Sequence, residues 1–292
     1  MSHRSGFVNI IGNPNVGKST IMNALVGEKL SIITSKAQTT RHRIMGIVNG
    51  DDFQIVYSDT PGILTPKYKL QEAMMSFVNN ALTDADLILY VTDVTEKPLS
   101  EKEYTHRIKS SGIPVIIAVN KIDLTNQQDL EKITEAWHEA FPESPVIPVS
   151  AINNFNLEPL LQAVLQRLPE GEPYFPKDQL TDRYERFFAS EILREKILMN
   201  YQEEIPYSVE IEIETFRDEE KILKIGAIIH VARDSQKGII IGHRGSMLKK
   251  VGTEARLDME DFFGKKVFLE LFVRVTKEWR NNPSILKRFG YR

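Results

Sequence analysis

The stretch Gly12-Asn13-Pro14-Asn15-Val16-Gly17-Lys18-Ser19 decides how the rest of this chain is interpreted. It follows an apolar run at residues 7–11, which predicts a strand, and it precedes residues 20–26, which have helical character. A strand, a glycine loop, a Lys-Ser pair and a helix form the context that a phosphate-binding P-loop needs. The backbone N–H groups of such a loop can hold phosphate oxygens, and the helix adds the positive end of its dipole.

We expect the residues from Gly12 to Thr20 to contact a nucleotide. The ammonium of Lys18 can reach the terminal phosphates, and the hydroxyl of Ser19 can ligate Mg²⁺. The loop by itself indicates only a phosphate site, so the base and the use of the nucleotide depend on the rest of the chain.

The composition is that of a globular protein with room for two domains. The chain has 292 residues, of which 41% are hydrophobic and 26% are charged. It has no cysteine, which excludes a disulfide framework, a cysteine zinc site and a cysteine nucleophile. No apolar run approaches the roughly 18 residues of a membrane span, and the first six residues are too polar for a signal peptide. We therefore expect a cytoplasmic protein.

Charge is distributed unevenly along the chain. Residues 221–292 contain 16 Lys and Arg but 7 Asp and Glu, a charge of +9. Because the net charge of the chain is −3, residues 1–220 carry a charge of −12. Such an asymmetry predicts that the C-terminal end faces a polyanion.

The first half of the chain alternates apolar runs with helical stretches. Expected strands occupy residues 7–11, 43–48, 53–58, 87–91, 115–119 and 146–149, and expected helices occupy residues 69–82, 100–110, 129–141 and 157–168. Asn49-Gly50-Asp51-Asp52 predicts a hairpin between the second and third strands. The later strands are apolar throughout, which favours a mostly parallel sheet covered on both faces. We therefore expect a three-layer α/β P-loop domain at residues 1–168.

Three prolines and a glycine in residues 169–176 exclude a helix or a central strand there. We expect a linker at residues 169–182 and a second domain at residues 183–292, whose first helix is capped by Thr181. Alternating apolar residues predict strands at residues 209–214, 222–231 and 267–275, with a helix over residues 246–263. The order α-β-β-α-β predicts a small α+β domain with a three-stranded sheet.

Two further motifs follow expected strands of the first domain. Asp59-Thr60-Pro61-Gly62 ends the third strand, where a carboxylate can hold Mg²⁺ through a water and the Gly62 N–H can meet a γ-phosphate. Asn120-Lys121-Ile122-Asp123 ends the fifth strand. The Asp123 carboxylate can accept two hydrogen bonds, from guanine N1–H and N2–H₂, and adenine offers no such pair of donors. This motif therefore selects guanine.

Other residues complete the expected base site. Asn120 can bind the base or brace the loop, and the stem of Lys121 can pack over the ring. Ser150 and Ala151 follow the sixth strand, where a backbone N–H can meet the guanine O6.

With these motifs in chain order, each at the end of an expected strand, the sequence resembles the translation-factor-related GTPases. Within them it is similar to the Era family over the whole chain, because Gln38-Thr39-Thr40-Arg41-His42-Arg43 has that family's switch-one form. The resemblance implies a GTP-hydrolysing enzyme that uses GTP, GDP and Mg²⁺. It also implies that Thr40 is the Mg²⁺ and γ-phosphate ligand, beside Ser19 and Asp59. Thr39 is the close rival, since both hydroxyls suit the role.

Ile63 departs from the Ras-like pattern, in which a glutamine at this place orients the attacking water. Isoleucine has no hydrogen-bonding group, so we expect slow intrinsic hydrolysis unless other groups orient the water. We assign the catalytic roles to Lys18, Thr40, Gly62 and Asn15. Asn15 is a candidate K⁺ ligand, because related GTPases with this asparagine use K⁺; the alternative is an asparagine that braces the loop.

The second domain carries Gly242-His243-Arg244-Gly245, which we expect to join a strand to a helix. The two glycines would let a nucleic-acid backbone approach closely, and KH domains clamp about four nucleotides in this way. The order of elements resembles the type II KH domain. The expected RNA contacts are Ile239 and Ile241 as a groove floor, Gly242, His243 and Gly245 at the backbone, and Arg244, Lys249 and Lys250 as charges. The tail at residues 277–288 either extends this basic surface or packs as a helix.

The resemblance implies binding to the 3′ region of 16S rRNA and assistance in 30S ribosomal subunit assembly and rRNA maturation. We expect a monomer in which GTP and Mg²⁺ order the loops around Thr40 and Gly62 and change how the KH domain is presented. Peripheral contact of the basic end with the inner face of the cell membrane is left open.

Two alternatives remain. A tRNA-modification GTPase of the TrmE type shares the Thr-Thr-Arg switch, but that family ends with a functional cysteine and carries its GTPase domain within a larger chain. A nucleotide-gated RNA-binding placeholder with negligible hydrolysis is compatible with Ile63. The single P-loop excludes the double-GTPase Der family.

Overall fold

A computed structural model describes residues 3–96 and 102–291 of the chain, which form two compact units. The first unit comprises Met1–Ser31, Thr40–Thr65 and Met74–Asp182, and the second comprises Ile32–Thr39, Pro66–Ala73 and Arg183–Arg292. Two short internal segments therefore group with the C-terminal residues, although they interrupt the first unit in sequence.

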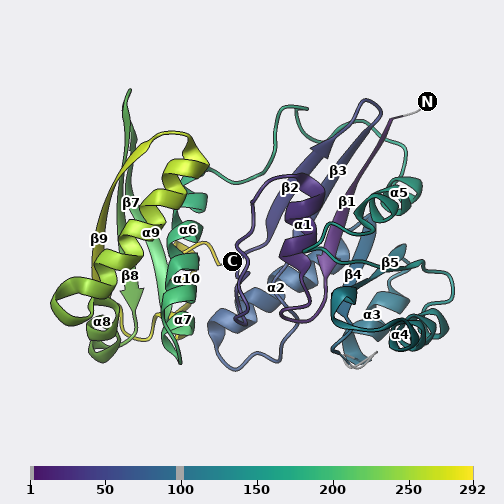
Figure 1. Cartoon of the computed structure of the whole chain (residues 1–292), viewed down its shortest axis with the longest axis horizontal. Coiled ribbons are helices and arrows are strands. Elements are labelled where there is room, and N and C mark those ends of the chain that lie inside the picture. Colours follow the sequence, from purple (N-terminus) through teal and green to yellow (C-terminus); the bar gives the residue numbers. More distant parts are fainter. Residues whose placement is uncertain (1–2, 97–101, 292) are drawn as a thin grey trace. The chain divides into compact units, whose positions relative to one another are not determined.

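A six-stranded sheet forms the centre of the first unit (Figure 1). Its strands are β1 (Arg4–Ile11), β2 (Ile44–Asn49), β3 (Phe53–Asp59), β4 (Leu87–Asp93), β5 (Val115–Asn120) and β6 (Val146–Pro148), in the order β2-β3-β1-β4-β5-β6. All neighbours pair in parallel except β2 and β3, which pair antiparallel around the predicted hairpin turn. Every residue of β4 and β5 is buried, as their continuous apolar character predicted.

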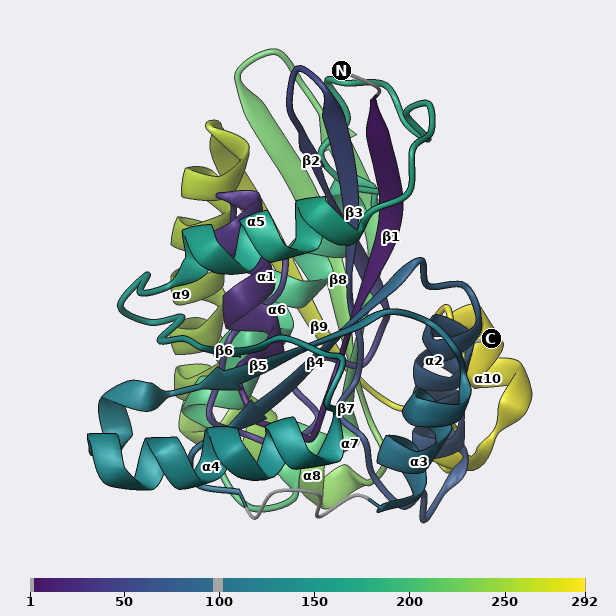
Figure 2. The same cartoon turned by 90° about the vertical axis from the view of Figure 1, so that its right-hand side faces the viewer.

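Helices cover both faces of this sheet. They are α1 (Lys18–Val26), α2 (Lys69–Thr83), α3 (Lys102–Ser110), α4 (Gln127–Ala140) and α5 (Leu157–Arg167). Figure 2 shows α1 and α5 on one face of the sheet and α2 and α3 on the other. The three-layer α/β prediction is confirmed; the expected start of α3 at Ser100 lies outside the described residues.

Residues 169–182 contain no helix and only isolated bridges, as their prolines predicted. They pack on the first unit: the hydroxyl of Ser5 donates to Glu172 O at 2.6 Å, and the amide of Gln54 donates to Phe175 O at 2.8 Å. The expected helix cap at Thr181 is wrong, because its hydroxyl donates to Met45 O at 2.7 Å and the next helix begins only at Glu185.

The second unit has a three-stranded sheet in the order β7-β8-β9. Its elements are α6 (Glu185–Asn200), α7 (Ile205–Ser208), β7 (Val209–Asp218), β8 (Ile222–Val231), α8 (Asp234–Ile241), α9 (Ser246–Phe263), β9 (Lys266–Val275) and α10 (Pro283–Arg288). β7 and β8 are antiparallel, whereas β8 and β9 are parallel. The expected strand before Gly242 is wrong: residues 234–241 are helix α8, so two helices, α8 and α9, follow β8 before β9.

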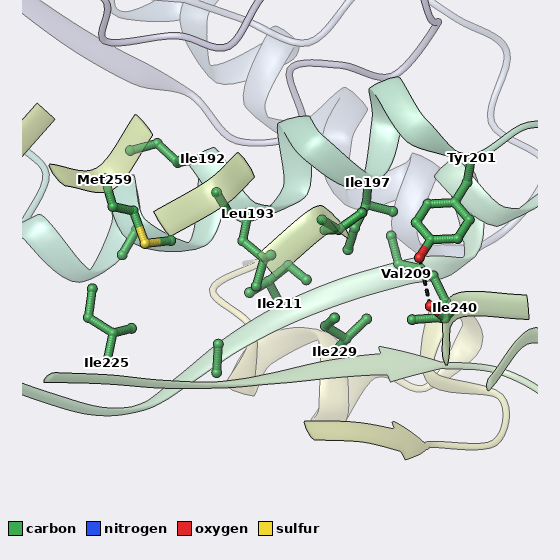
Figure 3. Packing of buried hydrophobic residues seen from close by; sticks show 14 of the residues in the cluster. Ile192, Leu193, Ile197, Tyr201, Val209, Ile211, Ile225, Ile229, Ile240 and Met259 are labelled. Carbon is green, nitrogen blue, oxygen red and sulfur yellow. Dashed lines mark hydrogen bonds between the residues drawn. The ribbon is translucent and has the colours of Figure 1, made fainter. Parts of the chain in front are cut away.

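Helices α6 and α9 lie against one face of this sheet and enclose its core (Figure 3). Leu193 and Ile197 of α6 point toward Ile211 and Ile229 of the sheet. The Tyr201 hydroxyl, at the end of α6, donates to Ile240 O at 2.6 Å and so ties α6 to the end of α8.

The C-terminal tail packs as a helix, which decides between the two interpretations of its basic residues. Trp279, Leu286 and Tyr291 are buried, and the Trp279 indole donates to Ser208 O at 3.2 Å. Within the described residues, no helix is long and apolar enough to cross a membrane.

Candidate nucleotide site and RNA-binding groove

The P-loop joins β1 to α1 in a conformation that depends on Gly17. Its φ of +95° lies in the left-handed region, and a Cβ there would come within 2.2 Å of the Asn120 side-chain nitrogen. That nitrogen donates to Val16 O at 2.9 Å, so the loop closes tightly against the residue that ends β5. Asn15 also has a positive φ, of 64°, and its side chain is exposed.

Lys18 is buried at the centre of the loop. Its ammonium donates to Gly12 O at 3.0 Å and to Asn13 O at 2.7 Å, and 6% of the residue is exposed. Burial lowers the pKa of Lys18 to about 8, although the carboxylates of Asp59 and Glu96 act in the opposite direction. A buried ammonium held by loop carbonyls suits an anionic phosphate ligand, which would offset the cost of its burial.

Two hydroxyls and one carboxylate converge beside Lys18. The Ser19 hydroxyl donates to Asp59 Oδ2 at 2.6 Å, the Thr40 hydroxyl donates to the same oxygen at 3.2 Å, and the two hydroxyls lie 2.9 Å apart. Burial raises the pKa of Asp59, against the hydrogen bond from Ser19 and the charge of Lys18, which lower it. Hard oxygen ligands of this kind are what Mg²⁺ prefers, so these residues fit the ion that the resemblance implies.

Thr39 does not share this arrangement. Its hydroxyl donates to Lys36 O at 2.6 Å and lies 2.6 Å from the Thr34 hydroxyl. Of the two neighbouring threonines, only Thr40 has its hydroxyl at Asp59.

The residues that follow Asp59 run directly beside the P-loop. The Thr60 hydroxyl donates to Ile10 O at 2.7 Å, and the Ile63 N–H donates to Gly12 O at 3.2 Å. Gly62 lies so close to Pro14 that a Cβ would meet its Cα at 2.7 Å. The Ile63 side chain is buried at 4% exposure, and being apolar it cannot orient a water molecule.

The expected base-binding residues also come together, at the ends of β5 and β6. The Ser150 hydroxyl donates to Asp123 Oδ1 at 2.5 Å and so fixes that carboxylate. Asn120 accepts from the Ala151 N–H at 3.0 Å, which shows that it braces two loops. The Lys121 ammonium pairs with Asp93 Oδ2 at 2.5 Å.

Sequence analysis missed two residues near this site, Asp93 and Glu96. Asp93 is the last residue of β4, between two strands whose ends had been singled out, so its place in the strand order was the available signal. It holds Lys121, whereas Glu96 contributes to the charge around Lys18.

A groove runs between α9 and β9 in the second unit. It is lined by Leu248, Lys249, Gly252, Thr253 and Arg256 of α9 and by Val267, Phe268, Leu269 and Leu271 of β9. Gly242-His243-Arg244-Gly245 lies at the start of α9. Gly242 has a φ of +72°, and a Cβ there would meet Met247 Cβ at 2.8 Å, so this turn requires glycine.

The two isoleucines expected to floor an RNA groove do not line this groove, and their contact with RNA stays a prediction. Ile239 lies on α8 with 48% of its surface exposed, and neither it nor Ile241 lines the groove, whose apolar side chains come from α9 and β9. Lys249 lines the groove, whereas Lys250 lies 3.9 Å from Glu254 and does not. Arg256 and Phe268 also line the groove, and neither was among the expected RNA contacts, although residues 249, 253 and 256 have the spacing of one helix face.

Family comparisons agree with both units. A family model described as "50S ribosome-binding GTPase" matches residues 7–121, and one described as "KH domain" matches residues 204–280. The chain is 45% identical to the GTPase Era of Syntrophus aciditrophicus (strain SB), over 99% of this chain and 95% of that one. It is also 45% identical to the GTPase Era of Geotalea daltonii, over 98% and 97% of the two chains.

Solved structures show the same likeness over the whole length. A crystal structure of Era in complex with MgGDPNP and nucleotides 1506–1542 of 16S ribosomal RNA matches with a TM-score of 0.95, at 40% identity over 99% of both chains. A crystal structure of an Aquifex aeolicus Era variant bound to GDP·AlF4⁻ matches with a TM-score of 0.94 at 41% identity. This chain therefore belongs to the Era family of GTPases.

Proposed function

We propose that this protein is a GTP-hydrolysing switch that binds the 3′ region of 16S rRNA and assists 30S subunit assembly and rRNA maturation. The observation that carries the proposal is the match along the whole chain to an Era structure that holds both MgGDPNP and 16S rRNA nucleotides. The P-loop site in one unit and the KH fold in the other supply the two activities separately. Residues 1–168 would form the nucleotide domain, 169–182 the linker and 183–292 the RNA-binding domain.

In this proposal, separate groups of the nucleotide site bind the phosphates, the base and Mg²⁺. The loop from Gly12 to Thr20 and the Lys18 ammonium hold the phosphates, and the Asp123 carboxylate, fixed by Ser150, selects guanine. Ser19, Thr40 and Asp59 would hold Mg²⁺, which neutralises charge on the phosphate oxygens when it is bound. The Gly62 N–H would meet the γ-phosphate, and Asn120 keeps the P-loop and the base loop together.

Hydrolysis is slow in this scheme, because Ile63 cannot orient the attacking water. Asn15, exposed on the P-loop with a positive φ, would supply a ligand for K⁺ at the phosphates. Turnover should then be faster in K⁺ than in Na⁺ at equal ionic strength. Equal rates in the two salts would show that Asn15 does not bind K⁺ and that it only braces the P-loop.

The RNA site lies in the groove between α9 and β9. Gly242 and Gly245 let the RNA backbone approach, while Arg244, Lys249 and Arg256 offer charge and Phe268 offers an exposed ring for base stacking. His243, between the two glycines, and Lys250, next to Lys249 in the chain, would be further contacts to the RNA backbone. Single-stranded RNA is the ligand that this combination suits, and the choice of 16S rRNA rests on the relative's complex.

Crosslinking the full chain to cellular RNA and sequencing the crosslinked sites tests the proposal. Sites should concentrate near the 3′ end of 16S rRNA, and they should be lost from a variant with Gly242→Asp. Sites concentrated in tRNA would contradict the proposal and favour the TrmE-type alternative.

The expected site of action is the cytoplasm, with the 30S subunit as partner and with the protein as a monomer. Peripheral contact with the inner face of the cell membrane is a separate expectation. Flotation with anionic lipid vesicles tests it, because a membrane-binding protein would rise with the vesicles and lose this behaviour at high salt.

A further inference from the structure

Arg194, on α6, is a charged group buried in the second unit. Its side chain is 1% exposed, and its guanidinium donates to both carboxylate oxygens of Glu191, at 2.7 and 2.6 Å. Two charges are removed from water here, which is costly unless their hydrogen bonds are well made. The same guanidinium makes one further bond that helix stability does not need: Nη2 donates to Thr39 O at 2.5 Å.

Thr39 ends the internal segment that groups with the second unit, and Thr40 begins the next segment of the first unit. The Thr39 carbonyl and the Thr40 N–H belong to one planar peptide group, because the C–N bond between them has partial double-bond character. Fixing the carbonyl oxygen therefore fixes the peptide plane, and with it the positions of the Thr40 backbone nitrogen and Cα. The Thr40 hydroxyl, in turn, reaches Asp59 and Ser19 at the expected Mg²⁺ site.

The rest of this internal segment has other anchors in the second unit. The Lys36 ammonium donates to Tyr201 O and, at 3.3 Å, to Gln202 Oε1. Tyr201 is the residue whose hydroxyl reaches the end of α8, next to Gly242. Arg194 thus lies on a helix that contacts both the Thr39 peptide and the base of the RNA-binding turn.

Building on the proposed function, we propose that Arg194 is a positioning residue that holds the Thr39–Thr40 peptide and thereby couples the nucleotide site to RNA affinity. With the Thr40 hydroxyl at Ser19 and Asp59, which would hold Mg²⁺, this bond links the Thr39–Thr40 peptide to α6. When Arg194 cannot hold Thr39, each site still binds its own ligand, but the bound nucleotide no longer changes the affinity for RNA and bound RNA no longer changes the affinity for the nucleotide.

Two variants test this, each with the full chain. Arg194→Lys keeps the charge beside Glu191 but cannot make both sets of bonds, and Glu191→Gln with Arg194→Met removes both charges together, which avoids an unpaired buried carboxylate. Lys196→Met is the matched control, because Lys196 lies on the same helix and pairs with Asp258 instead. For each protein, RNA affinity is measured with a GTP analogue and with GDP, and kcat and KM are measured as Mg²⁺ is varied.

We expect a ratio between the two RNA affinities of at least about fivefold in the unaltered protein and in the control. In both test variants the ratio should approach one, and hydrolysis should need more Mg²⁺, while the affinity for GDP stays unchanged. If the double variant does not fold, the ratio of RNA affinities and the Mg²⁺ dependence of the Arg194→Lys variant test the role of Arg194. Folded test variants that keep the normal ratio and Mg²⁺ dependence would overturn the role of Arg194.

The unaltered protein separates this inference from the proposed function. If it hydrolyses GTP and binds RNA but shows no nucleotide-dependent RNA affinity, the inference is overturned and the two activities stand. If it does neither, the proposed function fails and the inference fails with it.

Discussion

The hydroxyl oxygens of Ser19 and Thr40 lie 2.9 Å apart, although 21 residues separate them in the chain. Both hydroxyls donate to the same oxygen of Asp59. The pair brings the start of α1 and the segment before β2 to the end of β3. A single cation held by these groups would therefore fix three separate parts of the chain.

Replacing Thr40 with valine should lower Mg²⁺-dependent GTP hydrolysis about ten- to hundredfold, the effect of losing a hydrogen-bonding group at a charged site. Valine keeps the shape and removes the hydroxyl, so GDP affinity without Mg²⁺ should stay the same. Thr39→Val is the matched control, because the Thr39 hydroxyl bonds within its own loop. A larger loss for Thr39→Val than for Thr40→Val would show that the roles of the two threonines are reversed.

Asp123→Asn should exchange guanine for xanthine specificity. The amide presents a donor where the carboxylate accepted, and xanthine has an oxygen at C2 where guanine has an amino group. GTP affinity should fall by about 1.5–3 kcal/mol and XTP affinity should rise, which competition binding can measure.

Asp129→Asn is the control for this exchange, because Asp129 is an exposed carboxylate on α4 that pairs with Lys132 at 3.0 Å. Its preference for GTP should be unchanged. An Asp123→Asn protein that still prefers GTP over XTP would show that another group reads the base.

GTP affinity should fall as pH rises above about 8. Burial lowers the pKa of Lys18 to about 8 in the free protein, and bound phosphates favour the ammonium and so raise that pKa. Below about pH 8 the lysine is already charged, whereas above it a proton must be taken up on binding, at a loss of at most tenfold per pH unit. Calorimetry in two buffers of different ionisation enthalpy should detect this uptake, and binding at about pH 9 without it would contradict the shifted pKa.

Lys249→Gln should weaken RNA binding and reduce its salt dependence. One lost phosphate contact lowers the slope of log K against log salt concentration by about 0.7 for single-stranded nucleic acid. Lys132→Gln, which removes an exposed charge from α4, should change neither quantity. An unchanged salt slope for Lys249→Gln would place the RNA backbone outside the groove between α9 and β9.

The strands of the first unit could be predicted because continuous apolar runs and strand-end motifs agree on the same places. The choice between Thr39 and Thr40 could not be predicted, since both side chains carry the same hydroxyl. The backbone course of residues 32–40 decides it by directing only Thr40 toward Asp59. The sequence has no pattern that reports this direction.

Helix α8 was mistaken for a strand because Ile239, Ile240 and Ile241 are β-branched residues, which favour strands. The helix begins instead at Asp234, and its third residue, Gln236, accepts at its side-chain oxygen from the N–H groups of Ala232 and Arg233 at 3.0 and 3.1 Å. This local cap and the burial of Ile240 outweigh the strand propensity. Glutamine three residues after the cap position was the signal that could have found it.

Arg194 could not have been found from sequence. With Glu191 three residues earlier, it looks like an ordinary exposed helix pair. Its second partner, Thr39, lies 155 residues away in the chain. Only the fold shows that the pair is buried and that it holds a backbone carbonyl next to the nucleotide site.

The central claim is that one chain couples a GTP site to an RNA clamp. Its most direct test is the affinity of the full protein for a single-stranded RNA with the 3′ sequence of 16S rRNA, measured with a GTP analogue and Mg²⁺ and then with GDP. Affinities that differ by at least about fivefold are predicted. Equal affinities in the two nucleotide states would contradict the coupling.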